Sequence, residues 1–187
     1  MSVLFIKNMV CNRCIFMVQK EIEQLDLRMI SIKLGEVELE GELSVTEKER
    51  VGQALIALGF ELIDDKKSQL ITRIKTRIVE LVHYQNNELN MNLSDLLSKE
   101  FGHDYNYLST LFSEIEGKTI EKYVIAQKIE KIKELLVYDE LSLSEIAHQL
   151  NYSSVAYLSN QFKKVTGLTP SHFKKIGEKK RKSLDEV

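Results

Sequence analysis

Tryptophan is absent from this sequence, and proline and cysteine are scarce, with one proline and two cysteines among 187 residues. The chain has no apolar run of the roughly 18 residues that a membrane-spanning helix needs. The N-terminus lacks a basic segment followed by an apolar stretch and a small-residue cleavage site, so we expect no secretory signal. With 43% hydrophobic and 29% charged residues, the chain is typical of a globular cytoplasmic protein of one or two domains.

The scarcity of cysteine limits the roles open to Cys11 and Cys14. Two cysteines this close in sequence do not hold a secreted scaffold together, and they fit a reduced compartment better. A thioredoxin-like redox pair usually has a tryptophan beside it and a cis-proline opposite, whereas the only proline here is Pro170. Two thiolates three residues apart, on a loop that leads into a helix, can also converge on one soft metal ion. Metal binding, redox catalysis and a vestigial site on an interaction or dimerisation domain are therefore the alternatives for this pair.

Patterns typical of catalysis are also missing. The sequence shows no glycine-rich phosphate loop, no nucleophile elbow and no paired-carboxylate motif, so we expect a protein that is not an enzyme. The four histidines have no metal-ligand spacing. We expect them at the surface or at helix caps: His83, His103, His148 and His172.

Residues 143–173 predict two short helices joined by a tight turn, a helix-turn-helix. Ser142 and Glu145 have the spacing of a capping box at the first helix. Asn151 interrupts the apolar period and tolerates a left-handed conformation, while Gly167 ends the second helix. The second helix is expected to begin at a serine and to have an apolar inner face: Ser153 or Ser154, then Val155, Leu158, Phe162 and Val165.

The same pattern occurs 50 residues earlier. Leu93 and Ser94 match Leu143 and Ser144 at this offset. Asn92 with Asp95 offers a cap resembling that of the later unit. An ungapped repeat predicts two equivalent helix-turn-helix units, with residues 120–137 as a linker helix between them. Six further residues are identical at the same offset: Tyr107, Leu108, Ser109, Phe112, Gly117 and Thr119 match Tyr157, Leu158, Ser159, Phe162, Gly167 and Thr169.

Two such units joined by a helix, with FKKVTGLTPSHFKK closing the second, resemble the DNA-binding domain of the AraC/XylS family of bacterial transcription regulators. The resemblance covers about residues 70–178. It implies a sequence-specific regulator whose partner is double-stranded DNA, with RNA polymerase and a second copy of the chain as further candidate partners. The sequence departs from the family at two points. Lys128 stands where the family has arginine, and Asn151 stands where it has the turn glycine.

Helical geometry identifies the candidate DNA-binding residues. If Leu158, Phe162 and Val165 face the core, helical geometry points the opposite side of the helix outward, where its side chains are placed to enter a major groove. Lys163 and Lys164 also favour phosphate, whereas Glu114 stands at the position equivalent to Lys164, so the second unit is expected to be the better reader of sequence. The candidates are Asn106, Ser109, Thr110 and Ser113 in the first unit, and Ala156, Ser159, Asn160, Lys163 and Lys164 in the second.

Charge is spread unevenly along the chain. Residues 118–187 carry 13 Lys and Arg against 9 Asp and Glu, whereas residues 1–64 carry 7 against 11. A DNA-facing C-terminal end explains this bias, and a solvated charged surface is the other interpretation. The basic tail over 179–187 is expected either to contact phosphates or to serve as a disordered solubilising end.

Residues 1–65 predict a strand, a helix, a hairpin, a second helix and a last strand. The strands are expected at 3–7, 29–33, 36–43 and 60–63, with the second helix at 46–58. In the hairpin, alternation predicts inward-facing Ile30, Ile32 and Leu34 opposite Val37 and Leu39.

This order, with Met9, Cys11 and Cys14 on the first strand-to-helix loop and ALGF ending the second helix, resembles the heavy-metal-associated domain of copper chaperones. The resemblance implies a ferredoxin-like fold and a soft-metal site at Cys11 and Cys14. Two thiolates suit Cu(I) best, while Zn²⁺ needs further ligands. Arg13 departs from the small residues often found between the cysteines.

The expected fold is therefore α+β. A ferredoxin-like βαββαβ domain over 1–65 precedes a connecting amphipathic helix over 66–90 and an all-α domain over 91–178 of two helix-turn-helix units joined by a linker helix. The connecting helix is expected from Gln69 to Gln85. Packing against the following domain, a dimer seam and a lever are the three interpretations of its apolar stripe: Ile71, Ile74, Ile78, Leu81 and Val82. A metal carrier whose C-terminal half does not read DNA is the alternative function.

Overall fold

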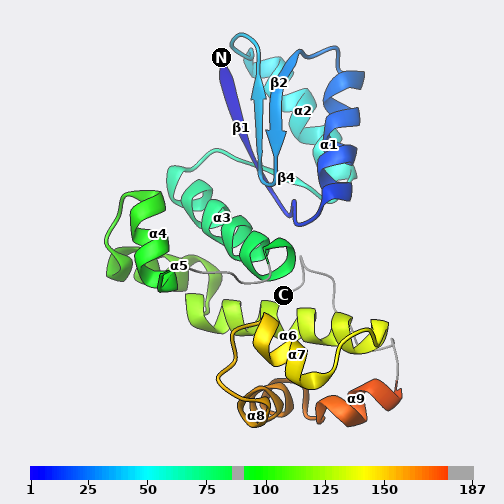
Figure 1. The fold of residues 1–187 in the computed structure, drawn as a ribbon. Coiled ribbons are helices and arrows are strands. Elements are labelled where there is room, and N and C mark those ends of the chain that lie inside the picture. The colour runs from blue at the N-terminus through cyan, green and yellow to red at the C-terminus, as the bar shows by residue number, and fades with distance from the viewer. Residues whose placement is uncertain (86–90, 177–187) are drawn as a thin grey trace. The chain divides into compact units, whose positions relative to one another are not determined.

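The computed structural model describes residues 1–85 and 91–176 (Figure 1). It shows a small N-terminal sheet region followed by an all-helical C-terminal part. The chain divides into two compact units, Met1–Thr76 and Arg77–Val187. This division falls within α3 (Lys66–Val79), whereas the sequence placed it before that helix. The predicted basic tail and the end of the connecting segment lie outside the described residues.

Unit 1 is a four-stranded antiparallel sheet with strand order β2-β3-β1-β4. Two helices supply the apolar side chains that cover it, because Val18 and Ile22 of the first, and Val51 and Leu55 of the second, recur at helical spacing and are buried. Alternate strand residues meet them from the sheet. The elements are β1 (Ser2–Lys7), α1 (Asn12–Gln24), β2 (Met29–Lys33), β3 (Glu36–Leu39), α2 (Val45–Ala57) and β4 (Glu61–Ile63).

The hairpin of β2 and β3 differs from the prediction at one residue. Ile32 pairs with Val37, and Leu34, Val37 and Leu39 are buried as expected. Ile30 was expected to face inward, but its side chain is 50% exposed. The pairing is irregular between Met29 and Ser31, and such a bulge turns the intervening side chain away from the face that simple alternation assigns to it.

Unit 2 is entirely helical in its described part. α3 continues into a π-helical turn, η1 (Glu80–Tyr84), so the predicted helix is present but starts earlier and ends in a different geometry. None of the helices in the described ranges is long and apolar enough to cross a membrane. The other elements are α4 (Leu93–Phe101), α5 (Tyr105–Glu116), α6 (Ile120–Tyr138), α7 (Leu143–Gln149), α8 (Val155–Thr166) and α9 (Pro170–Ile176).

The apolar stripe of α3 and η1 is buried within the chain. Each of its five members is at most 2% exposed: Ile71, Ile74, Ile78, Leu81 and Val82. A seam between two chains would leave such side chains open to solvent in a single copy. The burial therefore favours the interpretation that the stripe packs within one molecule.

The second helix-turn-helix unit has its own core. α6 contributes Ile129 and Ile132, and the rings of Phe162 and Phe173 meet edge to face with centroids 5.5 Å apart. Val165 was expected on this inner face, but it is 51% exposed. It lies in the last turn of α8, and its counterpart Ile115 in α5 is likewise 42% exposed.

Gly35 offers a test of the packing inside unit 1. Its backbone has φ +76°, and a Cβ there would lie 3.0 Å from Thr76 Oγ1. Gly41 has a similar φ of +82° with open space around it, which makes it a matched control. We expect both alanine variants to be destabilised by backbone strain, and Gly35→Ala to lose about 1 kcal/mol more because of the close contact. Urea unfolding measures both, and equal losses would show that the contact is unimportant.

Candidate nucleic-acid interface

The start of the second helix-turn-helix unit is stabilised as the sequence predicts. The Ser142 backbone N–H donates to Glu145 Oε2 at 2.7 Å, and the Glu145 N–H donates to Ser142 Oγ at 3.3 Å. These two reciprocal hydrogen bonds form a capping box. Hydrogen bonds from the Ser142 side chain and from its backbone hold the pKa of the Glu145 carboxyl below its usual value. α7 therefore begins at a residue that the local sequence specifies.

The turn between α7 and α8 follows from Asn151, whose φ is +52°. The next residue returns to the first helix, since the Tyr152 N–H donates to the Ala147 carbonyl at 2.8 Å. Of the two serines considered as caps, Ser154 performs this role and accepts a hydrogen bond from the Tyr157 N–H at 3.1 Å. Gly167, with φ +77°, ends α8 in the left-handed conformation.

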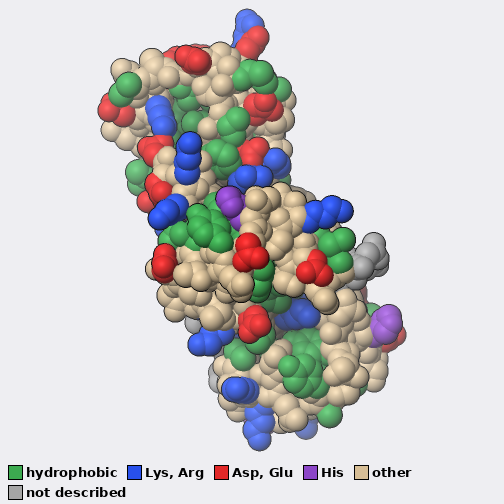
Figure 2. All heavy atoms as spheres, turned by 90° about the vertical axis from the view of Figure 1, so that its left-hand side faces the viewer, with side chains coloured by type: hydrophobic (Ala, Val, Ile, Leu, Met, Phe, Trp, Pro, Cys, Tyr) green, Lys and Arg blue, Asp and Glu red, His purple; other side chains and the backbone are tan. Residues whose placement is uncertain are grey.

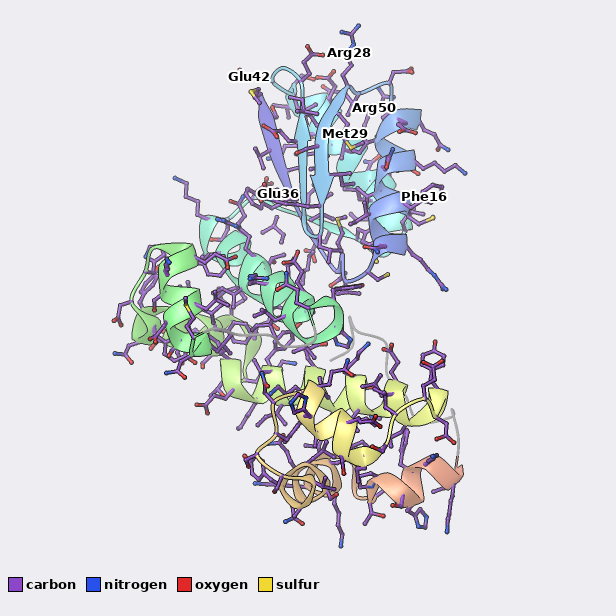
Figure 3. All side chains as sticks on the ribbon, in the orientation of Figure 1. Phe16, Arg28, Met29, Glu36, Glu42 and Arg50 are labelled. Carbon is purple, nitrogen blue, oxygen red and sulfur yellow. The ribbon has the colours of Figure 1, made fainter. Side chains whose placement is uncertain are left out.

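The outer face of α8 presents the predicted residues. We use "reading face" for Ala156, Ser159, Asn160 and Lys163. Ser159 is partly buried, and the other three are exposed, as is Lys164. On the face drawn in Figure 2, the part of unit 2 that holds α8 shows Lys and Arg side chains. A short polar face beside lysines suits a helix that contacts base edges and phosphates.

The first helix-turn-helix unit, formed by α4 and α5, has the same architecture as the second but different side chains on its outer face. Asp104, 50 residues before Ser154, caps α5 by accepting from the Asn106 N–H at 2.8 Å. Asn106 and Thr110 are exposed, whereas Ser109 and Ser113 are partly buried. The Ser113 hydroxyl donates to the Ser109 carbonyl at 2.8 Å, which occupies its donor within the helix.

One predicted cap of the first unit is wrong. Asn92 stands at the N-cap of α4, but its side chain makes no capping hydrogen bond.

α5 carries negative charge near its exposed side, since Glu114 is exposed and Asp104 is the cap. The first unit is therefore the less favourable of the two for phosphate.

Lys128 of α6 contacts the turn of the second unit, which the sequence did not predict. Its Nζ donates to the Leu150 carbonyl at 2.8 Å and lies 5.2 Å from the centre of the Tyr152 ring. The Tyr152 hydroxyl in turn donates to Gln161 Oε1 on α8 at 2.6 Å. Burial lowers the pKa of Lys128 and raises that of Tyr152. The departure from the family at Lys128 was visible in the sequence, but its partners depend on the fold.

The histidines behave as expected except for one. His148 and His172 are exposed, and His103 lies beside Tyr107 with ring centres 5.0 Å apart. His83 was expected at the surface or at a cap. Instead it is partly buried, and its Nε2 lies 2.9 Å from Oε1 of the fully buried Gln127. The residues next to His83 in the sequence do not indicate that it pairs with Gln127, which lies 44 residues away.

The cysteines lie at the start of α1. Cys11 is the N-cap, and the Cys14 N–H donates to the Cys11 carbonyl at 2.9 Å. The two Sγ atoms are 3.4 Å apart. The pKa of the Cys14 thiol is raised, first by burial and then by its hydrogen bond with the Cys11 thiol. Two sulfurs that bind the same zinc ion, each at about 2.3 Å, lie no more than about 4.6 Å apart. The observed Sγ–Sγ distance is below this limit, so the pair fits a shared ion. Within residues 1–85 and 91–176, no group of three or more His, Cys, Asp or Glu side chains is placed to hold a metal.

Comparison with known proteins supports the assignment of the helical part. Residues 97–176 match the family described as "Helix-turn-helix domain". This stretch is therefore similar to that family over α5 to α9 and the end of α4. The chain is 25% identical over 125 residues to the xylose operon regulatory protein of Escherichia coli (strain K12), which covers 66% of this chain and 32% of that relative. The chain thus spans about a third of the length of that regulator.

Two further likenesses cover the helix-turn-helix domain. The chain is 30% identical over 95 residues to an uncharacterized HTH-type transcriptional regulator in the cgkA 5' region of Pseudoalteromonas carrageenovora, covering 51% of this chain and 56% of that one. The solved C-terminal domain of AraT, a response regulator from Geobacillus stearothermophilus, matches with a TM-score of 0.51 at 22% identity. It covers 64% of this chain and 95% of the AraT domain, and it supports the fold.

Ser154 provides a test of how α8 is started. Ser154→Ala removes the oxygen that accepts from the Tyr157 N–H and is expected to destabilise the helix-turn-helix domain by about 1 kcal/mol. Ser153→Ala is the control, because Ser153 is the neighbouring exposed serine that does not cap α8. Urea unfolding followed by circular dichroism compares them. If Ser153→Ala costs as much as Ser154→Ala, the cap is misassigned.

Proposed function

We propose that this protein is a sequence-specific DNA-binding transcription regulator of the AraC/XylS type, and that it is not an enzyme. The observation that carries the proposal is the exposed polar face of α8, with Asn160 and Lys163 open to solvent on a helix whose other side is buried. The match of residues 97–176 to a helix-turn-helix domain supports it. The names of the similar proteins support regulation, since they include an operon regulatory protein.

The side chains of α8 divide into two roles. Asn pairs with adenine edges and Ser contacts several bases, so Asn160 and Ser159 specify sequence. Lys163 and Lys164 neutralise phosphates and anchor the helix without selecting a sequence. In the first unit, Asn106, Ser109 and Thr110 contribute to one or two base pairs, because Glu114 weakens phosphate contact there. RNA polymerase and a second copy of the chain are further candidate partners.

Selection from a random DNA pool tests the proposal against its alternative. A regulator enriches one sequence at physiological salt, whereas a metal carrier with a protein-docking C-terminal half retains no DNA and transfers metal to a partner domain. The similarity to transcription regulators favours the former. Failure to enrich any sequence would reject the regulator.

Substitutions on α8 separate specificity from anchoring. Asn160→Ala is expected to relax the preference at one base pair, at a cost of about 1 to 3 kcal/mol if the contact is bidentate. Lys164→Ala should weaken binding to all sequences alike and lower the salt slope by about one. Lys20→Ala on α1 is the control for charge alone, because Lys20 is also exposed. Fluorescence anisotropy on selected and unrelated duplexes measures both effects.

The assignment of Asn160 has a clear failure. Equal loss of affinity on selected and unrelated DNA for Asn160→Ala would show that this side chain does not specify a base. Thr110→Ala, at the equivalent position of α5, is the matched comparison, and we expect it to alter the preference less.

We further propose that residues 1–65 are a heavy-metal-associated domain of ferredoxin-like fold. The strand order β2-β3-β1-β4, with one helix after β1 and another after β3, supports this fold. The 3.4 Å separation of the Cys11 and Cys14 sulfurs supports one shared soft ion. Two sulfurs without further described ligands favour Cu(I), with Zn²⁺ second.

A bound ion regulates DNA binding only under a thermodynamic condition. It shifts the protein between two conformations, or between monomer and dimer, by no more than its difference in affinity for the two states. Because thiolates bind metal and thiols do not, affinity at Cys11 and Cys14 falls as the pH is lowered.

Replacement of both cysteines tests the metal hypothesis. Reduced wild-type protein is expected to bind one Cu(I) per chain, or one per two chains in a dimer, and the Cys11→Ser, Cys14→Ser double variant to bind none while keeping its circular dichroism spectrum. Equilibrium dialysis measures the metal. DNA affinity should respond to Cu(I) in the wild type alone. If both proteins bind metal alike, the cysteines are not the ligands, and if metal leaves DNA affinity unchanged, residues 1–65 are an interaction domain.

A further inference from the structure

Lys128 differs from the other basic residues of the helix-turn-helix domain in where its charge is directed. Its side chain is partly buried, and Nζ donates to the Leu150 carbonyl at 2.8 Å. Leu150 is the C-cap of α7, where unpaired carbonyls give the helix end a partial negative charge that favours a cation. The ammonium also lies over the Tyr152 ring, at 5.2 Å from its centre. Lys128 therefore binds both sides of the turn.

The contact continues from the turn to α8. The Tyr152 hydroxyl donates to Gln161 Oε1 at 2.6 Å, and the Tyr152 ring lies 5.9 Å from that of Tyr157, centre to centre. Gln161 is the residue after Asn160, on the side of α8 next to the reading face. An unbroken series of contacts thus runs from α6, through the turn, to the helix proposed to meet DNA.

The first unit lacks this series. At the positions 50 residues earlier, Gly102 replaces Tyr152 and Leu111 replaces Gln161. The end of α4 is instead contacted by Arg77, whose Nε donates to Glu100 Oε2 at 2.8 Å. In each helix-turn-helix unit, a basic side chain from the preceding helix lies at the end of the first helix. Among the residues described, only the second unit has a tyrosine that continues this contact to the recognition helix.

We propose that Lys128 is a positioning residue for DNA recognition, which holds α8 in its reading orientation through Leu150, Tyr152 and Gln161. The proposal rests on the proposed DNA-reading role of α8. Because the ammonium is already bound within the protein, Lys128 itself contacts no phosphate. Its loss should therefore reduce discrimination between sequences without changing the salt dependence of binding.

Three variants of the full-length protein test this role. Lys128→Met keeps much of the side-chain length and removes the donor, and Lys128→Arg restores a donor that also stacks on aromatic rings. Lys122→Met is the control, since Lys122 is an exposed lysine on the same helix. Amide hydrogen exchange over residues 150–161 reports the orientation of the turn without DNA. Anisotropy on selected and unrelated duplexes over a range of salt concentrations reports recognition.

For Lys128→Met we expect faster exchange over residues 150–161 and a fall of about tenfold in the ratio of selected to unrelated affinity, the size of one lost hydrogen bond from a charged donor. The salt slope should not change, and Lys128→Arg should recover most of the ratio.

Three results overturn the proposal. Exchange in Lys128→Met equal to that in Lys122→Met shows that Lys128 does not hold the turn. An unchanged affinity ratio, or a salt slope lowered by about one, shows that it does not act by positioning α8. If wild-type protein prefers no sequence, the proposed regulator function fails instead, and amide exchange alone decides whether Lys128 positions α8.

Discussion

The burial of α6 is the constraint on which the helix-turn-helix domain depends. One side of this 19-residue helix packs Ile129, Ile132 and Leu136 into the core of the second unit. Near its start, the Tyr123 ring lies 5.6 Å from Phe112 of the first unit, centre to centre. Two adjacent polar residues then contact different partners, since Gln127 lies against His83 of η1 and Lys128 against the end of α7. One helix thus fixes the local geometry of both units.

Charge distinguishes the two units that this common architecture produces. Ser154 starts α8 with a neutral hydroxyl, whereas Asp104 starts α5 with a carboxylate. Lys164 near the end of α8 is matched by Glu114 in α5. Equivalent helix caps thus coexist with opposite charge, so the repeat keeps its fold while its two copies differ in the charge that they would present to a phosphate.

The features predicted correctly from the sequence are those with local causes. The capping box of Ser142 and Glu145, the left-handed Asn151 and the helix end at Gly167 all depend on residues within a few positions of each other. The exposure of the Asn160 side follows from the helical period in the same way. Residues 107–119 repeat several residues of this pattern 50 positions earlier. The prediction made from one copy therefore supported the prediction made from the other.

Most of the predictions that failed depend on neighbours distant in sequence or on irregular backbone, whereas the Asn92 cap failed within its own helix turn. Ile30 is turned outward by a bulge that strand alternation does not reveal. Val165 has the right period but is exposed in the last turn of α8. His83 has a partner 44 residues away, and only the packed fold brings the two together. The roles of Cys11, Cys14 and the reading face stay predictions, because geometry shows access and spacing rather than a bound partner.

The central claim is that DNA meets the second unit through α8. The most direct test is to titrate isotope-labelled full-length protein with its selected duplex and follow backbone amide chemical shifts. We expect the largest changes along Ala156–Lys164, with smaller changes in α5 and none in the N-terminal sheet. Largest changes in residues 1–63, or in α5 with α8 unaffected, would contradict it.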